Sequence, residues 1–330
     1  MTLGKLLRLG LGIAFGALFL WLILRNITLS SVRVALQDAN ALLLLGAVAV
    51  FFVGYACRIA RWRLMLSQEN PAVSWRQCAG PLMASVAANN VLPFRAGDLL
   101  RAFGFNSRLG ISAATSLTTL FVERLLDLLM VLAFLGLALS LFGADSVRFI
   151  GMGAGVMLAA ATVALFVLLF PQVFKPLAFW SGRLASRLVP RLGARILQEI
   201  EKIFSVLAGV ATRGTMVRLI AWSFLAWAAE GLVFWFVALA LPSIGNSAAA
   251  WLALPLGTLS TLIPGTPGYV GTFDFFTAKA MSALGNELAA STAFALVIHV
   301  VLWLPPTLAG GLYLALKPVR HRDVLKARST

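Results

Sequence analysis

The sequence predicts an all-α polytopic membrane protein with about six full transmembrane helices and two opposed re-entrant helical hairpins. Of the 330 residues, 60% are hydrophobic and only 12% are charged. A soluble domain could not bury so much apolar surface, whereas a bilayer accommodates it. The apolar residues also form runs of membrane-spanning length, and most basic residues lie between these runs.

The apolar runs define the predicted spans, because about 20 helical residues cross the hydrocarbon layer of a bilayer. Such runs occur at residues 6–24, 41–57, 112–142, 149–170, 216–241 and 288–316. Lys5 and Arg8 lie at the start of the first run, as basic residues do in a signal peptide. No small-residue cleavage site follows Leu24, so we expect this run to be a retained signal anchor.

The distribution of lysine and arginine orients the spans. Of the 27 basic residues, 22 fall in the segments 1–8, 58–76, 93–110, 171–218 and 317–330. Basic segments of membrane proteins stay in the cytoplasm, so we expect a bacterial-type inner (plasma) membrane protein with both termini cytoplasmic. This segregation also accounts for the net charge of +15 without a nucleic-acid partner.

Two further apolar stretches predict hairpins that enter and leave the membrane on one side. Residues 77–92 lie between two segments assigned to the cytoplasm, and residues 248–285 lie between an outgoing and a returning span. Both hairpin tips follow the pattern aliphatic-Pro-x-x-x-Gly, at residues 92–97 and 263–268. This pattern is weak alone, because proline and glycine are common in loops.

Each hairpin lies in the middle of a span–hairpin–span unit. Residues 41–142 and 216–316 would be inverted repeats, joined by a linking span at 149–170 and a basic amphipathic cytoplasmic segment at 171–215. Residues 1–330 would then form a single membrane domain. Inverted repeats with broken helices are a recurrent plan of secondary transporters. The alternative is a pair of unrelated interfacial loops.

The first hairpin tip carries residues suited to bind a phosphate. We expect Pro93 to begin the returning helix, whose N-terminus would attract an anion. The guanidinium groups of Arg95 and Arg101 match phosphate oxygens. The alternative is that both arginines reach the cytoplasmic interface and pair with Asp98.

Four charged residues within the spans predict a central charged cavity. Glu123, Arg124 and Asp127 lie in one span and Glu230 lies in another. Charges at such depth normally face a bundle interior or a wet cavity. Arg124 can pair with Asp127 three residues later. Glu230 is either a proton-coupling carboxylate or a partner of Arg124. The four residues together form either a structural network or a site that binds the substrate.

Asp274 and Lys279 are five residues apart, which is poor spacing for a helical pair, so we expect each to meet another partner. His299 lies within a span, and we expect it to be a hydrogen-bonded packing residue. Cys57 and Cys78 fit no metal-binding spacing and predict free thiols. The sequence carries no metal, nucleotide or catalytic-triad motif, so no cofactor is expected.

At these residues the chain resembles the lysylphosphatidylglycerol synthase transmembrane region, a flippase-like family of integral membrane proteins. The resemblance covers residues 5–316 and rests on Asn90, Pro93, Arg95, Gly97, Asp98 and Arg101, on Glu123, Arg124 and Asp127, and on PGTPGYVGTFDFF at 264–276, with Pro264, Pro267, Gly268, Gly271 and Asp274. Where such modules are fused to a synthase, the family implies transfer of aminoacylated phosphatidylglycerol between leaflets. Stand-alone members are expected to transport lipids or lipid-linked sugars. In this chain Asp274 stands where we expect Glu or Gln, and nothing after residue 316 could form the soluble aminoacyl-transferase domain.

The basic segment predicts contact with the membrane surface. Basic residues recur every four positions from Arg183 to Arg195, which places them on one helical face. We expect an amphipathic helix on the anionic lipids of the inner leaflet.

Together these patterns predict a lipid flippase, not an enzyme, that moves an anionic phospholipid or a phosphate-linked lipid carrier between leaflets. Its expected partners are that lipid and anionic inner-leaflet lipids, and the sequence also allows a homo-oligomer. One alternative is a membrane-embedded lipid-modifying transferase that uses Glu123 or Asp98 as a base. Another is a scaffold subunit of such an enzyme.

Overall fold

The computed structural model describes residues 36–92, 95–143, 190–210, 212–262 and 266–317, together with single positions between 163 and 183. The predicted first span at 6–24 and most of the linking span at 149–170 lie outside these residues. In the described part every regular element is a helix, which confirms the predicted all-α class.

Four helices of the described part are long and apolar enough to cross a membrane. They are α3 (Ala41–Leu66), α7 (Ala113–Phe142), α11 (Arg213–Ala240) and α14 (Leu288–Leu316). Side chains cap two of their N-termini: the Asn40 side chain accepts hydrogen bonds from the first turn of α3, and the Ser112 side chain accepts one from the first turn of α7. Four of the six predicted spans are therefore present.

The predicted end of the second span was wrong. The apolar run stops at residue 57, but α3 continues to Leu66 and its last turns carry Arg58, Arg61 and Arg63. The helix persists because residues 58–70 contain neither glycine nor proline. Arg58 and Arg61 are thus helical residues of the interior, although their charges suggested a cytoplasmic loop.

Both stretches predicted as hairpins contain pairs of shorter helices. The first pair is α4 (Trp75–Val91) and α5 (Ala96–Gly104), followed by the single turn α6 (Asn106–Leu109). The second is α12 (Ala250–Ser260) and α13 (Thr272–Ala283), preceded by the turn η3 (Ser247–Ala249) and separated by the turn η4 (Pro267–Tyr269). The members of each pair pack against one another. That the pairs re-enter the membrane stays a prediction.

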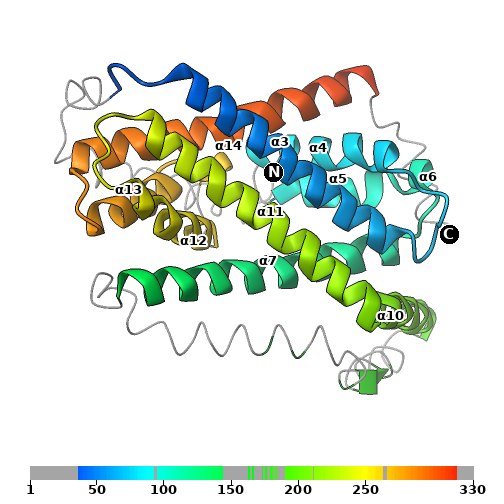
Figure 1. The fold of residues 1–330 in the computed structure, drawn as a ribbon. Coiled ribbons are helices and arrows are strands. Elements are labelled where there is room, and N and C mark those ends of the chain that lie inside the picture. The colour runs from blue at the N-terminus through cyan, green and yellow to red at the C-terminus, as the bar shows by residue number, and fades with distance from the viewer. Residues whose placement is uncertain are drawn as a thin grey trace, which may run out of the picture.

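The two span–pair–span units pack reciprocally (Figure 1). Helix α3 lies along α11, and the backbone N–H of Asn40 donates to the carbonyl of Ala240, so the start of one helix meets the end of the other. The first helix pair packs through α4 on α14 of the second unit, and the second pair packs through α12 on α7 of the first unit. Exchanging the two units leaves this set of contacts unchanged, as a two-fold relation between them would require.

Glycines permit close contact at the first helix pair. A Cβ atom on Gly97 would lie 1.9 Å from the backbone oxygen of Ser85, and one on Gly310 would lie 2.1 Å from that of Met83. Both distances are far below van der Waals contact, so only glycine fits at these positions. The first pair is therefore held tightly within itself and against α14.

Two large hydrophobic clusters form most of the core of the described residues. Along α7, Val122 and Leu126 belong to one cluster, whereas Met130 and Phe134 belong to the other. Asp127 falls at the junction between them, which is where the charged residues of the interior gather.

The predicted basic segment at 171–215 contains α10 (Pro190–Val210). Lys175 lies 3.7 Å from Glu201 of this helix, in an exposed ion pair. The side chains of Arg187, Arg191 and Arg195, on which the predicted membrane-facing stripe depends, lie outside the described residues.

Candidate functional site: a charged cavity between the two units

A cavity of about 530 Å³ lies between the two units. Residues from α3, α4, α5, α7, α11, α12 and α14 line it, together with the two ends of the connection between α12 and α13. One part of the wall is charged, and another consists of aliphatic and aromatic side chains such as Leu82, Val86, Leu128 and Leu302. Pockets that combine apolar walls with a few polar groups are typical of ligand sites.

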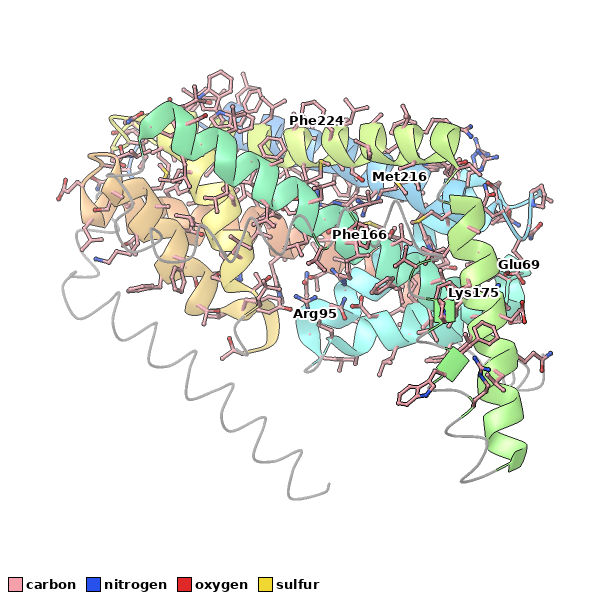
Figure 2. All side chains as sticks on the ribbon, turned by 90° about the horizontal axis from the view of Figure 1, so that it is seen from below. Glu69, Arg95, Phe166, Lys175, Met216 and Phe224 are labelled. Carbon is pink, nitrogen blue, oxygen red and sulfur yellow. The ribbon has the colours of Figure 1, made fainter. Side chains whose placement is uncertain are left out.

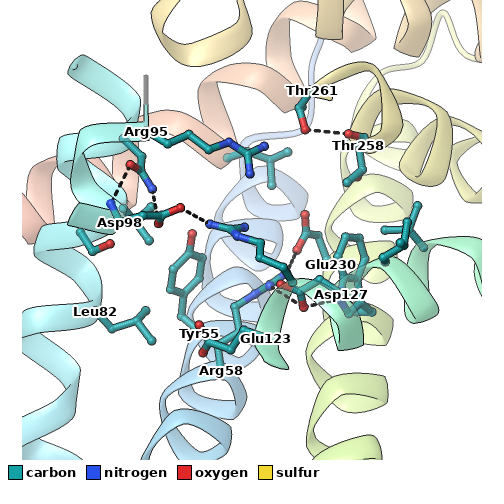
Figure 3. A pocket seen from close by; sticks show the side chains of 18 of the residues that line it. Tyr55, Arg58, Leu82, Arg95, Asp98, Glu123, Asp127, Glu230, Thr258 and Thr261 are labelled. Carbon is teal, nitrogen blue, oxygen red and sulfur yellow. Dashed lines mark hydrogen bonds and ion pairs between the residues drawn. The ribbon is translucent and has the colours of Figure 1, made fainter. Parts of the chain in front are cut away.

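Four of the arginines that line the cavity are matched with its four carboxylates (Figure 3). The pairs are Arg58 with Glu230, Arg61 with Asp127 at 2.8 Å, Arg101 with Glu123, and Arg124 with Asp98 at 2.7 Å. Each pair joins two different helices, so the charges tie α3, α5, α7 and α11 together around the cavity.

The deepest pair joins α5 to α7. Arg101 is 6% exposed and Glu123 is 4% exposed, and the guanidinium of Arg101 also lies over the Trp62 ring at 5.1 Å. Arg61 of α3 lies beside them and bonds both Asp127 and the hydroxyl of Ser223. Removing one partner from such a buried network leaves an uncompensated charge, which is strongly destabilising.

The helix at whose N-terminus an anion site was predicted begins later than expected. Helix α5 begins at Ala96, three residues after Pro93, and Pro93 itself lies outside the described residues. The backbone N–H of Asp98 already donates to the side chain of Asn89, and the Asp98 carboxylate occupies the first turn. An anion bound there would lie beside the Asp98 carboxylate, which carries a charge of the same sign.

Asp98 is held as a carboxylate by its neighbours. Burial acts to raise its pKa, but Arg124 and the hydrogen bond from Asn89 outweigh burial and leave the pKa below its ordinary value. The alternative in which Asp98 pairs with Arg95 or Arg101 was wrong, because its partner is Arg124.

Arg95 differs from the other arginines of the cavity. It precedes α5 with φ of 52°, a left-handed conformation that is uncommon outside glycine. Its Nε–H donates to the hydroxyl of Tyr269 at 2.8 Å, and the guanidinium lies 5.8 Å from that ring. Among the described residues no carboxylate lies within ion-pair distance of Arg95.

The contact between Arg95 and Tyr269 joins the two helix pairs. Tyr269 also has a positive φ, of 60°, in the turn that precedes α13. Figure 2 shows Arg95 between the cyan helices of the first pair and the yellow and orange helices of the second. The two segments therefore meet at the wall of the cavity.

The other predicted residues of the first pair have structural contacts. Asn90 lines the cavity, and its side chain donates to the carbonyl of Trp303 and the hydroxyl of Thr307 on α14. Gly97 lies against the backbone of α4, as described above. These contacts fix the first pair to the second unit.

The described residues that were predicted as site residues in the second pair are not among those that line the cavity. Asp274 accepts the N–H of Gly271 at the start of α13 and contacts His299 Nδ1 at 2.7 Å. Lys279 is exposed and lies over the Phe275 ring. Asp274 and Lys279 thus meet separate partners, as expected, and His299 is within hydrogen-bond distance of Asp274.

The glycines and prolines of that motif shape the connection. Gly268 and Gly271 adopt φ of 70° and 90°, which suits glycine. Pro267 begins the short turn η4, whereas Pro264 lies outside the described residues.

Two predicted pairings inside the spans were wrong. Arg124 turns toward Asp98 of α5, so it does not pair with Asp127 of its own helix. Glu230 is paired with Arg58, so it is neither an isolated carboxylate nor the partner of Arg124. Glu123, Arg124, Asp127 and Glu230 nevertheless all line the one cavity.

Sequence reasoning missed several lining residues, above all Tyr55, Arg58 and Arg61 of α3 and Tyr269. Tyr55, Arg58 and Arg61 follow at intervals of three, which places them near one face of a helix. That signal was available, but it required α3 to continue beyond its apolar run.

The cavity reaches the surface beside the second pair. Leu262 lines it and is 67% exposed, and Val270 close by is 44% exposed. No group of three or more metal-ligating side chains occurs in the described ranges. The site is thus a charged pocket with an apolar opening.

Comparison with known proteins gives two findings. The family model described as the lysylphosphatidylglycerol synthase TM region matches residues 9–310. Glycosyltransferase AglD of Haloferax volcanii is 25% identical over 333 aligned residues, which cover 91% of this chain and 53% of that protein. The chain spans about half the length of this curated relative.

Proposed function

Because the chain belongs to the family of the lysylphosphatidylglycerol synthase transmembrane region, we propose that it moves an anionic lipid between the leaflets of a membrane. The lipid is an anionic phospholipid or a phosphate-linked lipid carrier. The cavity between the two units would hold the head group, while the acyl or prenyl chains stay in the bilayer.

One observation carries this proposal: the cavity combines an apolar opening with an arginine, Arg95, that has no carboxylate partner among the described residues. Arg95 presents terminal guanidinium nitrogens that suit phosphate oxygens. Leu262 at the opening offers a surface compatible with hydrocarbon. A water-soluble substrate would need no such opening.

The proposal assigns roles to the two helix pairs. Each would be a re-entrant hairpin, the first entering from the cytoplasm and the second from outside. The reciprocal packing of the units supports this arrangement, because an inverted repeat places equivalent elements on opposite sides. The protein would lie in a bacterial-type inner membrane with both termini in the cytoplasm.

Vesicle reconstitution tests the transport function. The purified protein is placed in vesicles that contain a trace of phosphatidylglycerol with a fluorescent acyl chain, and dithionite is added outside. We expect bleaching beyond the outer-leaflet fraction, because lipid from the inner leaflet reaches the reagent. Bleaching equal to that of protein-free vesicles would contradict the function.

Arg95→Gln should slow this transport, whereas Arg218→Gln serves as the matched control. Arg218 is an exposed arginine of α11 whose Nε–H donates to the carbonyl of Gly214, away from the cavity. Equal rates for the two variants would place the phosphate site elsewhere.

A transferase that acts within the membrane is the second candidate. It is favoured by the similarity to a protein named as a glycosyltransferase, although only about half of that protein is matched. We propose that the present chain has no such activity alone. Incubation with sugar nucleotides and polyprenyl phosphate should give no new lipid; product that disappears in Glu123→Gln would favour the transferase.

A further inference from the structure

The formal charges of the described side chains that line the cavity do not sum to zero. Among the described lining residues there are five arginines and four carboxylates, and neither lysine nor histidine. Each carboxylate is matched with an arginine, as described above, which leaves Arg95 unmatched. The described lining residues therefore carry a surplus of one positive charge, located at Arg95.

We propose that the cavity selects lipids whose head group has one net negative charge, such as a phosphodiester bearing glycerol or sugar hydroxyls, and disfavours head groups with added amines. This specificity rests on the proposed function, because it names the class of lipid that the same site accepts. It separates the substrate from aminoacylated phosphatidylglycerol, in which a lysyl group turns the head group cationic.

The ion pairs explain why other charges fit poorly. A dianionic phosphomonoester needs a second free cation, and a lysyl group needs a free carboxylate. Either requirement would break an existing pair, and for buried pairs that leaves a charge without a partner. A singly charged phosphodiester neutralises Arg95 and leaves every pair intact.

Tyr269 prepares Arg95 for this ligand. Its hydroxyl accepts from Nε–H at 2.8 Å, so the contact uses one of the five guanidinium donors. The terminal nitrogens remain for two phosphate oxygens in a bidentate arrangement. Tyr269 is thus a positioning residue that holds the guanidinium at the edge of the cavity.

Neutral hydroxyl groups complete the site. Tyr55 points into the cavity (Figure 3), and its hydroxyl has no hydrogen-bond partner among the described residues. Thr258 and Thr261 donate to backbone carbonyls of α12 and keep accepting lone pairs. Such groups suit the hydroxyls of glycerol or sugar without altering the charge balance.

The test compares lipid preference in variants that change the surplus charge. Binding to the detergent-solubilised protein is measured by native mass spectrometry for phosphatidylglycerol, lysyl-phosphatidylglycerol and a phosphatidyl-linked sugar. The wild type should prefer the first and third lipids over the lysyl lipid at least tenfold. Arg95→Gln removes the surplus and should weaken phosphatidylglycerol binding by about 30-fold or more.

Reversing the charge at Arg95 gives the most decisive comparison in this binding experiment. Arg95→Glu makes the surplus negative, so it should lose phosphatidylglycerol and gain lysyl-phosphatidylglycerol. Arg218→Glu makes the same charge change outside the cavity and should keep the wild-type preference. Tyr269→Phe keeps the charge but loses the contact with Nε, so it should weaken both anionic lipids while the order of preference is unchanged.

A second variant covers the case in which Arg95→Glu fails to fold. Asp98→Asn raises the surplus to two, because it frees Arg124 while retaining a side chain of similar shape. It should favour phosphatidic acid at alkaline pH, where the monoester is dianionic, over phosphatidylglycerol. Unchanged preference in the folded variant would overturn the proposal.

Two outcomes separate this proposal from the transport function. Suppose that the wild type moves lipids in vesicles but binds the lysyl lipid and phosphatidylglycerol with equal affinity. The proposed specificity is then wrong, and the transport function stands. If binding follows the charge rule but no lipid crosses the vesicle bilayer, the specificity stands and transport fails.

Discussion

Arg95 and Arg101 are six residues apart, yet the structure gives them different environments. Arg101 is buried against Glu123 and Trp62, whereas Arg95 lies at the cavity edge beside Tyr269. From the sequence we expected the two arginines to hold one phosphate together. In the proposed function Arg95 therefore meets the ligand, whereas Arg101 supports the wall.

This division predicts opposite effects of two alanine substitutions. Arg101→Ala leaves Glu123 buried without its partner on α5 and should cost about 3–5 kcal/mol of stability, seen as a lower thermal unfolding temperature. Arg95→Ala should leave that temperature nearly unchanged and reduce lipid binding.

Thermal unfolding in detergent, followed by intrinsic tryptophan fluorescence, measures both variants. The double variant Arg101→Leu with Glu123→Leu is the control, because it removes both charges and should recover much of the loss. If Arg95→Ala were the more destabilised single variant, the assignment of roles would be reversed.

The sequence predicted which carboxylates line the cavity but not their partners. Glu123, Asp127 and Glu230 stood out because charges are rare within apolar runs. Their partners come from other helices, and Arg58 is separated from Glu230 by 172 positions. Local spacing cannot reveal such pairs, because they depend on which helices pack together.

At the scale of elements, apolar length predicted the four long helices well and their ends less well. Spans predicted at 112–142, 216–241 and 288–316 match α7, α11 and α14 within a few residues. The end of α3 was missed because the apolar composition ends at residue 57, whereas the residues that follow still favour a helix. The apolar composition of a segment indicates which part of a helix is surrounded by lipid. It does not indicate where the helix ends, because the end depends on the groups that cap it.

The packing of α4 on α14 gives a test with a matched control. At Gly310 a methyl group would meet the backbone of Met83, whereas at the neighbouring Gly311 it would meet nothing within 4 Å. Gly310→Ala should therefore separate the helices and lower the unfolding temperature. Gly311→Ala should be neutral or stabilising, since alanine favours a helix by about 1 kcal/mol over glycine.

The same pair of variants should be compared in the vesicle transport measurement. Loss of transport in Gly310→Ala alone would show that the seating of the first helix pair matters to function. Equal unfolding temperatures for the two variants would contradict the close contact.

For the whole molecule, the proposed orientation can be tested by cysteine labelling. Gln68→Cys and Ser107→Cys lie at exposed positions on either side of the first helix pair, and Gly245→Cys lies at the far end of α11. We expect an impermeant maleimide to label the first two from the cytoplasmic side and the third from outside. The natural Cys57 and Cys78 are buried, so they should contribute little background.

Labelling of positions 68 and 107 from opposite sides would mean that the first helix pair crosses the membrane fully. The inverted-repeat arrangement would then be lost, although the cavity would remain. The sequence could propose this arrangement because basic residues segregate between the runs. It could not supply the packing partners of each pair, which lie in the other unit.

The exchange of partners between the units has a consequence for biosynthesis. Helix α4 leaves the ribosome well before α14, the helix on which it is seated through Gly310. The surface of α4 that packs on α14 therefore has no partner in the newly inserted first half until translation is nearly complete. Contacts between such distant segments form slowly, since the long loop between them must close first. If the chain is divided within residues 144–189, each half lacks the packing partner that the other half supplies. The two halves should therefore assemble only when they are expressed together.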